Sequence, residues 1–358
     1  MLNAMPRTKE FEVVVACPPH GTLEKKLAQL GIRTYTLDFG KYAFNHRPDW
    51  HFGFYLRFRR ILVASRPDIV VVNLDGNTPL VTLAALRSGI PIVRFSRFEF
   101  KSPKRWIENY CWLKAAAVIC PSEMVREQVL LWAPVSFHSR VERWYDPIHI
   151  PPNYADQEEK LRAELGLKFS KVIIFVGRLD PKKGIETALH AFSLIRKICS
   201  DIRFILVGDH DGSAAGADYA SNLRRLTCQL GLDDAVSFLG YRNDVLALLA
   251  LSSVSILPSE SESFGMVLAE AWSVATPTVA SDVGGCREIT LASGGGRLFP
   301  VGNSDKLAKL TLEVLQDPAL ARSLALSGQA WVRKNCDPQH YASRFANLML
   351  TLCVSKHP

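Results

Sequence analysis

The stretch KVIIFVGRLDPKKG, residues 171–184, is the clearest strand–loop–helix unit in the chain. Its first half is a run of β-branched and aromatic residues without polar alternation, which is typical of a strand buried on both faces of a sheet. Its second half is a polar turn bounded by glycines, and a helical pattern follows. A buried strand, a loop and a helix in that order predict an α/β protein with a parallel sheet.

The same alternation continues in both directions along the 358 residues. It predicts two doubly wound, Rossmann-like domains, with a boundary in the proline-containing segment 148–160. The expected strands are 11–17, 33–39, 68–73, 91–95 and 117–122 in the first domain, and 171–177, 203–209, 235–240, 254–259, 276–281 and 296–300 in the second.

Composition excludes several classes of protein. The chain is 48% hydrophobic and 22% charged, which is typical of a globular protein. Its apolar runs are shorter than the roughly 18–20 residues of a membrane span, and its start is a poor signal peptide. The 8 cysteines are scattered without a Cys-x-x-Cys pair, which predicts reduced thiols, a cytoplasmic location and no metal site.

The net charge of +8 is unevenly distributed. Residues 1–150 carry 21 Lys and Arg against 13 Asp and Glu, whereas residues 151–358 carry 22 of each. The first part also interleaves arginines with aromatic residues in 47–66 and 94–106. This pattern suits an anionic membrane surface or a lipid-phosphate acceptor, with single-stranded nucleic acid well behind. A core helix with a solvated basic face has about the same weight as membrane contact.

Two cations, Arg178 and Lys183, follow the strand at 171–177. A planar guanidinium and a mobile ammonium on one glycine-bounded loop suit a diphosphate. For this loop alone, ordinary solvated charges are the commoner explanation. Loops after other strands, at 208–216, 240–244 and 281–285, are expected at the same edge of the sheet, and this convergence favours a binding site.

The stretch SESESFGMVLAEAW, residues 259–272, places Glu262 and Glu270 on either side of Gly265. A helix that begins near the glycine offers free N–H groups to an anion. Glu270 lies in an apolar helical run, where an unpaired carboxylate costs several kcal/mol, so it should have a partner in the ligand or in the protein. The alternatives are a buried arginine partner or a solvated edge for Glu270. Gly284 and Gly285 allow backbone to approach a ligand closely, or simply form a tight turn.

Together, GRLDPKKG, PSESESFGMVLAEA and ASDVGGCREI resemble the donor domain of retaining glycosyltransferases of the large fourth family, the glycosyl transferases group 1. The spacing from Glu262 to Glu270 matches that family's acid–seven residues–acid motif. The resemblance covers nearly all of the second part and extends more weakly through the first. It implies a GT-B fold, in which two Rossmann-like domains face a central cleft. The implied domains are 1–152 on the acceptor side, 153–336 for the donor, and a last helix, 337–358, that packs back on the first domain.

The resemblance also implies a role for each site residue. Arg178 and Lys183 would bind the donor diphosphate and stabilise it as it leaves, and Glu262 would contact hydroxyls of the donor sugar. Glu270 would bind the ribose hydroxyls, so its partner would be the ligand. The remaining donor contacts would come from Gly177, from the backbone amides of Ser263, Phe264, Gly265 and Met266, from Tyr241 and Arg242 around the base, and from Gly284 and Gly285.

The chain departs from the family pattern in three places. It begins at what corresponds to the family's second strand, so the first strand, glycine-rich loop and helix are expected to be absent. The histidine often found near the donor sugar is missing, with Asp75, Arg94 and Arg97 as candidate substitutes. Ala275 stands where the family usually has glycine.

The resemblance predicts a retaining glycosyltransferase that is cytoplasmic and peripheral at the inner face of the membrane. It would move a sugar from a nucleotide-diphosphate sugar, UDP- or GDP-linked, to a glycan or lipid-linked acceptor in surface polysaccharide or glycolipid synthesis, without cofactor or metal. An alternative is a non-catalytic nucleotide-sugar-binding subunit that needs a partner subunit. A sugar-nucleotide epimerase ranks lower because His20 and His210 are the only loop histidines near strand ends. A dinucleotide dehydrogenase ranks lowest because neither domain has G-x-G-x-x-G after its first strand.

Overall fold

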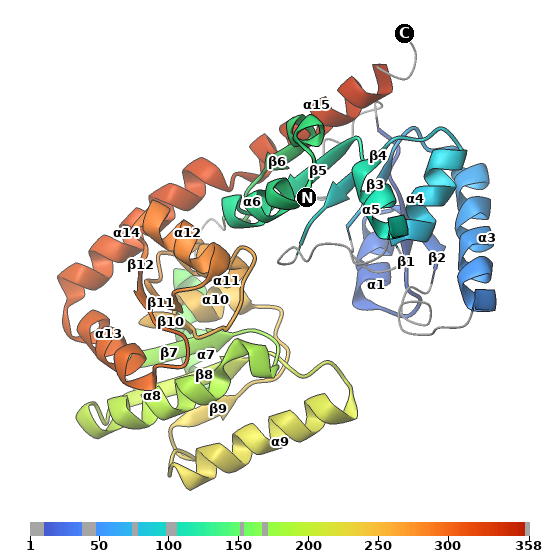
Figure 1. The fold of residues 1–358 in the computed structure, drawn as a ribbon. Coiled ribbons are helices and arrows are strands. Elements are labelled where there is room, and N and C mark those ends of the chain that lie inside the picture. Colours follow the sequence, from blue (N-terminus) through green and yellow to red (C-terminus); the bar gives the residue numbers. More distant parts are fainter. Residues whose placement is uncertain are drawn as a thin grey trace. The chain divides into compact units, whose positions relative to one another are not determined.

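The computed structural model describes residues 11–37, 48–73, 78–97, 106–150, 154–166 and 171–354, and it divides the chain into two compact units (Figure 1). Unit 1 comprises Met1–Trp144 with Pro338–Pro358, and unit 2 comprises Tyr145–Asp337. The division therefore follows Trp144 rather than residue 152, because Tyr145, Ile148 and Ile150 pack into the core of unit 2.

Unit 2 is built on a six-stranded parallel sheet with the order β12-β11-β10-β7-β8-β9. In chain order, this is the doubly wound arrangement in which strands are added first on one side of β7 and then, from β10 on, on the other side. All six strands were predicted from their apolar runs. Their bounds are β7 Lys171–Val176, β8 Ile202–Val207, β9 Val236–Phe238, β10 Val254–Leu257, β11 Thr278–Ser281 and β12 Gly296–Phe299.

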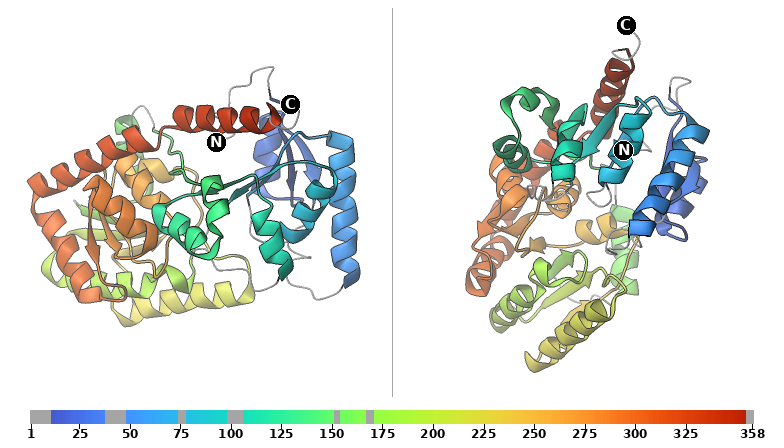
Figure 2. Two further views of the ribbon diagram at one scale, coloured as in Figure 1. Left: turned by 45° about the horizontal axis from the view of Figure 1, so that its top comes forward. Right: turned by 45° about the vertical axis from the view of Figure 1, so that its right-hand side comes forward.

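Helices cover both faces of this sheet, as the strand composition requires. Side chains of β7 alternate between two cores: Ile173 and Phe175 pack with α8 and α13, and Val172, Ile174 and Val176 pack with α10. Because each face is buried, every position of β7 after Lys171 is apolar. The long helix α9 lies alongside α8 in both views of Figure 2. The helices are α7 Ala155–Glu164, α8 Ile185–Ile198, α9 Ala214–Gln229, α10 Val245–Ala250, α11 Met266–Ser273, α12 Gly284–Ser293, α13 Ser304–Gln316 and α14 Pro318–Asn335, with a 3-10 turn η2 at Pro181–Lys183.

Unit 1 contains a four-stranded parallel sheet, β3-β4-β5-β6, and a parallel pair, β1-β2. Strand β6 was not predicted, because two of its three residues are charged and only Val141 is buried. The strands are β1 Val14–Cys17, β2 Arg33–Thr36, β3 Val70–Val72, β4 Ile92–Phe95, β5 Ala117–Cys120 and β6 Val141–Arg143. The helices are α1 Thr22–Gln29, α3 Pro48–Ser65, α4 Thr78–Arg87, α5 Trp106–Leu113 and α6 Glu123–Trp132, with the 3-10 helix η1 Val135–Arg140.

The last helix, α15 (Pro338–Val354), belongs to unit 1. Tyr341, Phe345 and Met349 are four residues apart, so they lie on one face and pack against β4 and β5. The ring of Phe345 stacks on Phe95 at 6.2 Å, and Tyr341 meets Trp144 edge-on at 5.5 Å. The chain therefore leaves unit 1 after β6 and returns to it through this helix.

Candidate functional site

The site of interest lies where the sheet of unit 2 reverses its direction of winding. β7 and β10 are hydrogen-bonded neighbours, and each is connected onward to a different side of the sheet. Such a switch point leaves a crevice outside the carboxyl ends of the two strands, which is where ligands bind in open α/β sheets. The loops that follow these strands are 177–184 and 258–265, the two loops that the sequence motifs single out.

The first loop presents Arg178 to solvent. Its side chain is 58% exposed, and its Nη2 lies 3.4 Å from Oδ2 of Asp180. Asp180 also caps η2 by accepting a hydrogen bond from the backbone N–H of Lys182. Gly177 closes the strand, with its N–H bonded to the carbonyl of Val207. Arg178 is thus held only loosely, at a solvent-exposed ion pair that contributes little to stability.

The two loops meet through an ion pair. Lys183 donates to Oε1 of Glu262 at 2.5 Å, and Ser259 Oγ donates to the same oxygen at 2.9 Å. The side chains of Lys183 and Glu262 are 24% and 15% exposed, so this contact is stronger than one at an open surface. The structure therefore brings together two residues that are 79 positions apart in sequence, both of which were predicted as site residues.

The second loop ends at the N-terminus of α11. Gly265 is the N-cap and has φ of 93°, a left-handed conformation that a side chain would strain. Gly285 lies against this loop: a Cβ there would come within 2.5 Å of Phe264 Cα, and its N–H donates to the carbonyl of Glu262 at 2.8 Å. Gly284 is the first residue of α12. Gly285 therefore packs directly against the backbone of Ser263 and Phe264, and Met266 follows the turn as the first residue of α11.

Glu270 lies on α11 and is partly buried. Burial raises the pKa of its carboxyl group from 4.5 to about 7. Within the described part of the chain, no residue donates a hydrogen bond or an ion pair to this carboxylate, so the buried-arginine alternative finds no support there. The acid is therefore desolvated without compensation from the described protein.

Tyr241 and Arg242 follow β9. Tyr241 is 64% exposed. Arg242 is held in the protein by two carboxylates, with Nη2 at 2.6 Å from Asp244 and Nη1 at 2.9 Å from Glu164. The hydrogen bonds from Arg242 lower the pKa of Asp244. The flat face of the guanidinium is available for contact with a base, and each of its three nitrogens already donates one hydrogen bond to a carboxylate.

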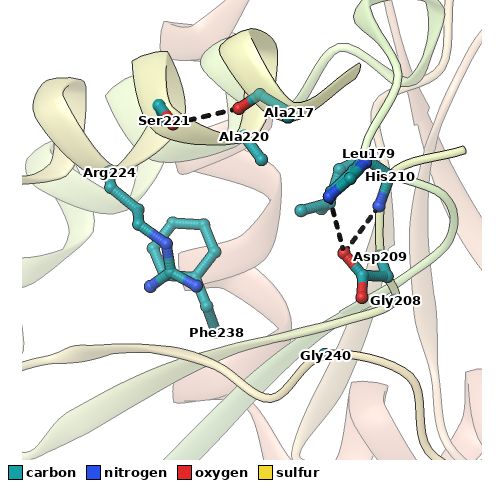
Figure 3. A pocket seen from close by; sticks show the side chains of 10 residues that line it. All are labelled: Leu179, Gly208, Asp209, His210, Ala217, Ala220, Ser221, Arg224, Phe238 and Gly240. Atoms are coloured by element: carbon teal, nitrogen blue, oxygen red, sulfur yellow. Dashed lines mark hydrogen bonds and ion pairs between the residues drawn. The ribbon is translucent and has the colours of Figure 1, made fainter. Parts of the chain in front are cut away.

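A cavity of about 300 Å³ opens beside this loop (Figure 3). It lies between α9 and the ends of β8 and β9, and Gly240 borders it. Arg224 lies over the ring of Phe238, with its guanidinium carbon 4.5 Å from the ring centroid. On the opposite side, Asp209 accepts from the backbone N–H of its neighbour His210 at 2.8 Å. Sequence reasoning did not predict Arg224 or Phe238, because a helical arginine and a strand phenylalanine carry no motif.

The residues proposed in place of the missing histidine are in unit 1. Asp75 lies outside the described residues. Arg94 is only 2% exposed, with its guanidinium 4.6 Å from the ring of Trp112. Arg97 donates to Oδ1 of Asn73 at 2.8 Å. Burial makes Arg94 a core residue in this structure, whereas Arg97 is open to solvent on one side.

In the ranges given above, no group of three or more His, Cys, Asp and Glu side chains is placed to hold a metal ion. Over the same ranges, no helix combines the length and apolarity needed to cross a membrane.

Two family models match the chain. The model described as Glycosyl transferases group 1 matches residues 157–331, and the model described as Glycosyltransferase Family 4 matches residues 1–150. The chain belongs to the group 1 glycosyltransferases. The first model spans both loops of the switch point, together with Glu270 and the cavity.

The chain is similar to N-acetyl-alpha-D-glucosaminyl L-malate synthase of Bacillus anthracis, with 32% identity over 167 residues, which is 46% of this chain and 42% of that protein. It is 27% identical to alpha-D-kanosaminyltransferase of Streptomyces kanamyceticus over 226 residues, or 62% and 56% of the two chains. The chain thus spans about half the length of the curated relatives that it matches.

Solved structures establish the fold of the chain. HepE from Anabaena, solved with UDP-glucose, superposes with a TM-score of 0.82 at 21% identity, over 94% of this chain and 91% of HepE. Sucrose-phosphate synthase from Thermosynechococcus elongatus gives 0.74 at 20% identity, over 96% and 99% of the two chains. The predicted GT-B fold with two Rossmann-like domains is confirmed, while the predicted roles of the site residues stay predictions.

Proposed function

We propose that this glycosyltransferase retains anomeric configuration and transfers a hexosyl group from a nucleotide-diphosphate sugar to a glycan or lipid-linked acceptor, in surface polysaccharide or glycolipid synthesis. The observation that carries the proposal is the meeting of Lys183 and Glu262 at the switch point, beside the N-terminus of α11. Arg178 on the same loop adds a second cation. Neighbours of the same fold that are solved with UDP and with UDP-glucose favour a UDP-linked donor.

The diphosphate would lie between the cations and the start of α11. Arg178 is exposed and Lys183 is mobile along its aliphatic stem, so both can turn toward phosphate oxygens. The free N–H groups at the start of α11 would donate to the same anion from the other side. Fixed charges and dipoles aimed at a developing negative charge are usually the largest catalytic contribution.

In the chemical step, the bond between the sugar anomeric carbon and the diphosphate oxygen breaks, and the bonding electrons leave with the diphosphate. The acceptor hydroxyl oxygen forms its bond to the same face of that carbon, and its proton passes to an oxygen of the departing phosphate. Arg178 and Lys183 stabilise the charge on the leaving group. Glu262, released as Lys183 turns to phosphate, accepts hydrogen bonds from hydroxyls of the donor sugar.

The nucleoside would occupy the other end of the site. Glu270 would accept hydrogen bonds from the ribose hydroxyls, which provide the partners that its desolvated carboxylate lacks among the described residues. The base would lie against Tyr241 and Arg242, with its edge toward the cavity bordered by Gly240. The exposed ring of Tyr241 and the flat guanidinium of Arg242 offer stacking surfaces to a base.

Binding and slow hydrolysis of a panel of nucleotide-sugars test this proposal. Glu270→Ala should weaken binding of the preferred donor, and Glu262→Ala should abolish its hydrolysis. Glu260→Ala is the matched control, because this neighbouring side chain is exposed. Loss of binding in the control equal to that in Glu270→Ala would contradict the assignment. Donor binding without turnover, even with membrane extract as acceptor source, would favour the binding-subunit alternative.

We also propose that α3 of unit 1 contacts an anionic membrane surface. Phe52 and Val63 are 63% and 68% exposed, and they lie along one side of the helix. Arg59 and Arg60 lie near them and make no ion pair with a described residue. Exposed apolar side chains beside exposed arginines suit an interface of headgroups and acyl chains.

Sedimentation with vesicles tests the membrane contact. The protein should bind vesicles that contain phosphatidylglycerol and bind less with Phe52→Ser or with Arg59→Glu and Arg60→Glu together. Lys309→Glu on α13 of unit 2 is the control for net charge. Equal binding to neutral phosphatidylcholine vesicles, or equal loss in the control, would contradict a role for the α3 charges.

A further inference from the structure

Tyr145 is the residue at which the chain enters unit 2, and its side chain contacts three elements of that unit. Its ring stacks on Phe264 with centroids 5.7 Å apart and planes at 30°. It meets Trp331 of α14 at 5.0 Å. Its hydroxyl donates to Oε1 of Glu288 on α12 at 3.1 Å. No motif singles out Tyr145, which lies outside every loop that the sequence assigned to the donor.

Phe264 connects Tyr145 to the donor loop. Its backbone lies between Glu262 and Gly265, in the turn whose amides would hold phosphate and sugar. Its side chain is 2% exposed, so the position of the ring fixes the position of the turn. Gly285 packs against the backbone of Phe264 on one side, and Tyr145 packs against its ring.

Glu288 connects Tyr145 to the second wall of the turn. It lies on α12, one helical turn after Gly285, whose N–H donates to the carbonyl of Glu262 at 2.8 Å. Tyr145 therefore contacts the loop through its ring and contacts the helix that supports the loop through its hydroxyl. A substitution of Tyr145 would therefore alter how the loop at 262–265 packs against α12.

We propose that Tyr145 is a positioning residue for donor binding. It holds the ring of Phe264 against α12, so that the amides of residues 263–266 and the side chain of Glu262 stay in register with Arg178 and Lys183. The inference rests on the proposed donor site, and it requires no contact between Tyr145 and the donor. Displacement of a binding group by about 1 Å can cost up to about a hundredfold in rate, so an indirect effect of this kind is measurable.

The test compares two substitutions of Tyr145 with a control elsewhere in the same core. Tyr145→Leu removes the ring and the hydroxyl, and it should raise the Kd for UDP-glucose and UDP by about tenfold. Tyr145→Phe keeps the ring and should raise it only about twofold. Phe192→Leu is the control: it breaks the Phe192–Phe204 contact at 5.3 Å, and it should lower the melting temperature with an unchanged Kd.

The hydroxyl contact has its own test. Glu288→Ala and Tyr145→Phe should each raise the Kd slightly, and the Kd of the double variant should be no higher than that of the weaker-binding single variant, because both substitutions break the same Tyr145–Glu288 hydrogen bond. Additive effects would contradict the coupling.

The positioning role is overturned if Tyr145→Leu binds UDP-glucose like wild type at a temperature where both are folded, or if Phe192→Leu loses as much affinity. Failure of the proposed function looks different, since wild type itself would then bind no nucleotide-sugar.

Discussion

Glu262 and Glu270 belong to one motif, yet their carboxylates have opposite environments. Glu262 receives a lysine and a serine hydroxyl on one oxygen. Glu270 is desolvated, with a pKa raised to about 7, and the described residues supply it with no donor. Glu262 therefore has hydrogen-bond donors in the protein itself, whereas the proposed donors for Glu270 are hydroxyl groups of the ligand.

The difference follows from where each carboxylate stands. Glu262 lies on the loop after β10, next to the loop after β7 that carries Lys183, because β7 and β10 are neighbours at the switch point. Glu270 lies more than a turn into α11, beyond the reach of that loop. In the proposed donor site, the diphosphate end would be preorganised by the Lys183–Glu262 ion pair, whereas the nucleoside end would present Glu270, an acceptor without a donor among the described residues.

Lys183→Ala removes the ion pair with Glu262 and has the largest expected effect. The variant loses a cation from the leaving group and leaves Glu262 partly buried without its lysine. We expect donor turnover to fall by about a hundredfold to a thousandfold, as when one stabilising donor is removed from an oxyanion site. Lys182→Ala is the matched control, because this lysine is adjacent and exposed. Equal losses in the two variants, measured as initial rates of donor hydrolysis, would mean that general charge and not the pair with Glu262 matters.

Glu270→Gln tests the carboxylate that lacks a donor among the described residues. It should raise the free energy of unfolding above pH 7 and lower the affinity for the donor. The carboxyl pKa is about 7 in the folded protein and 4.5 in the unfolded chain. Between these values the folded state keeps a proton that the unfolded chain has lost, so the free energy of unfolding falls as pH rises from 4.5 to 7 and stays low above that range. The loss is on the order of 3 kcal/mol. The glutamine variant lacks this pH dependence and should be the more stable protein above pH 7.

The same substitution should weaken donor binding by about tenfold, because an amide is a poorer acceptor for two hydroxyls than a carboxylate. Urea unfolding at several pH values and calorimetric titration with UDP-glucose measure the two effects. A variant that is less stable than wild type above pH 7, or that binds equally well, would show that Glu270 is already satisfied in the protein.

The sequence predicted the strands of unit 2 because they are almost entirely apolar, and it predicted the two motif loops at the carboxyl ends of strands. It could not reach the contact between Lys183 and Glu262, which depends on strand order and joins residues 79 positions apart. It also missed the hydrogen bond from Arg242, in the loop after β9, to Glu164 at the end of α7, because these residues are 78 positions apart. Strand β6 was missed because a short, mostly charged strand has no hydrophobic periodicity.

The cavity beside Gly240 and the stacking of Tyr145 on Phe264 were also beyond the sequence. Both depend on side chains that belong to no sequence motif and that come together from separate helices, strands and loops. A pattern of residues along the chain reports burial and turns, whereas the shape of a hollow depends on how helices pack on the sheet. The departure at Ala275, in contrast, was visible in the sequence, and the structure supplies its physical cost.

Ala275→Gly should have the smallest effect and leave both carboxylates unchanged. Ala275 follows Val274, the C-cap of α11, and has φ of 59°; its N–H donates to the carbonyl of Trp272. A left-handed conformation costs a residue with a Cβ about 1–2 kcal/mol, part of which glycine returns as entropy of the unfolded chain. We therefore expect stability to rise by about 1 kcal/mol, with unchanged donor affinity. Ala330→Gly, at an exposed helical position of α14, should instead lower stability by about as much. If both substitutions destabilise in thermal unfolding, the backbone at residue 275 is not left-handed in solution. If Ala275→Gly also weakens donor binding, the backbone conformation after α11 affects the position of Glu270. The environments of Glu270 and Glu262 would then not be independent of each other.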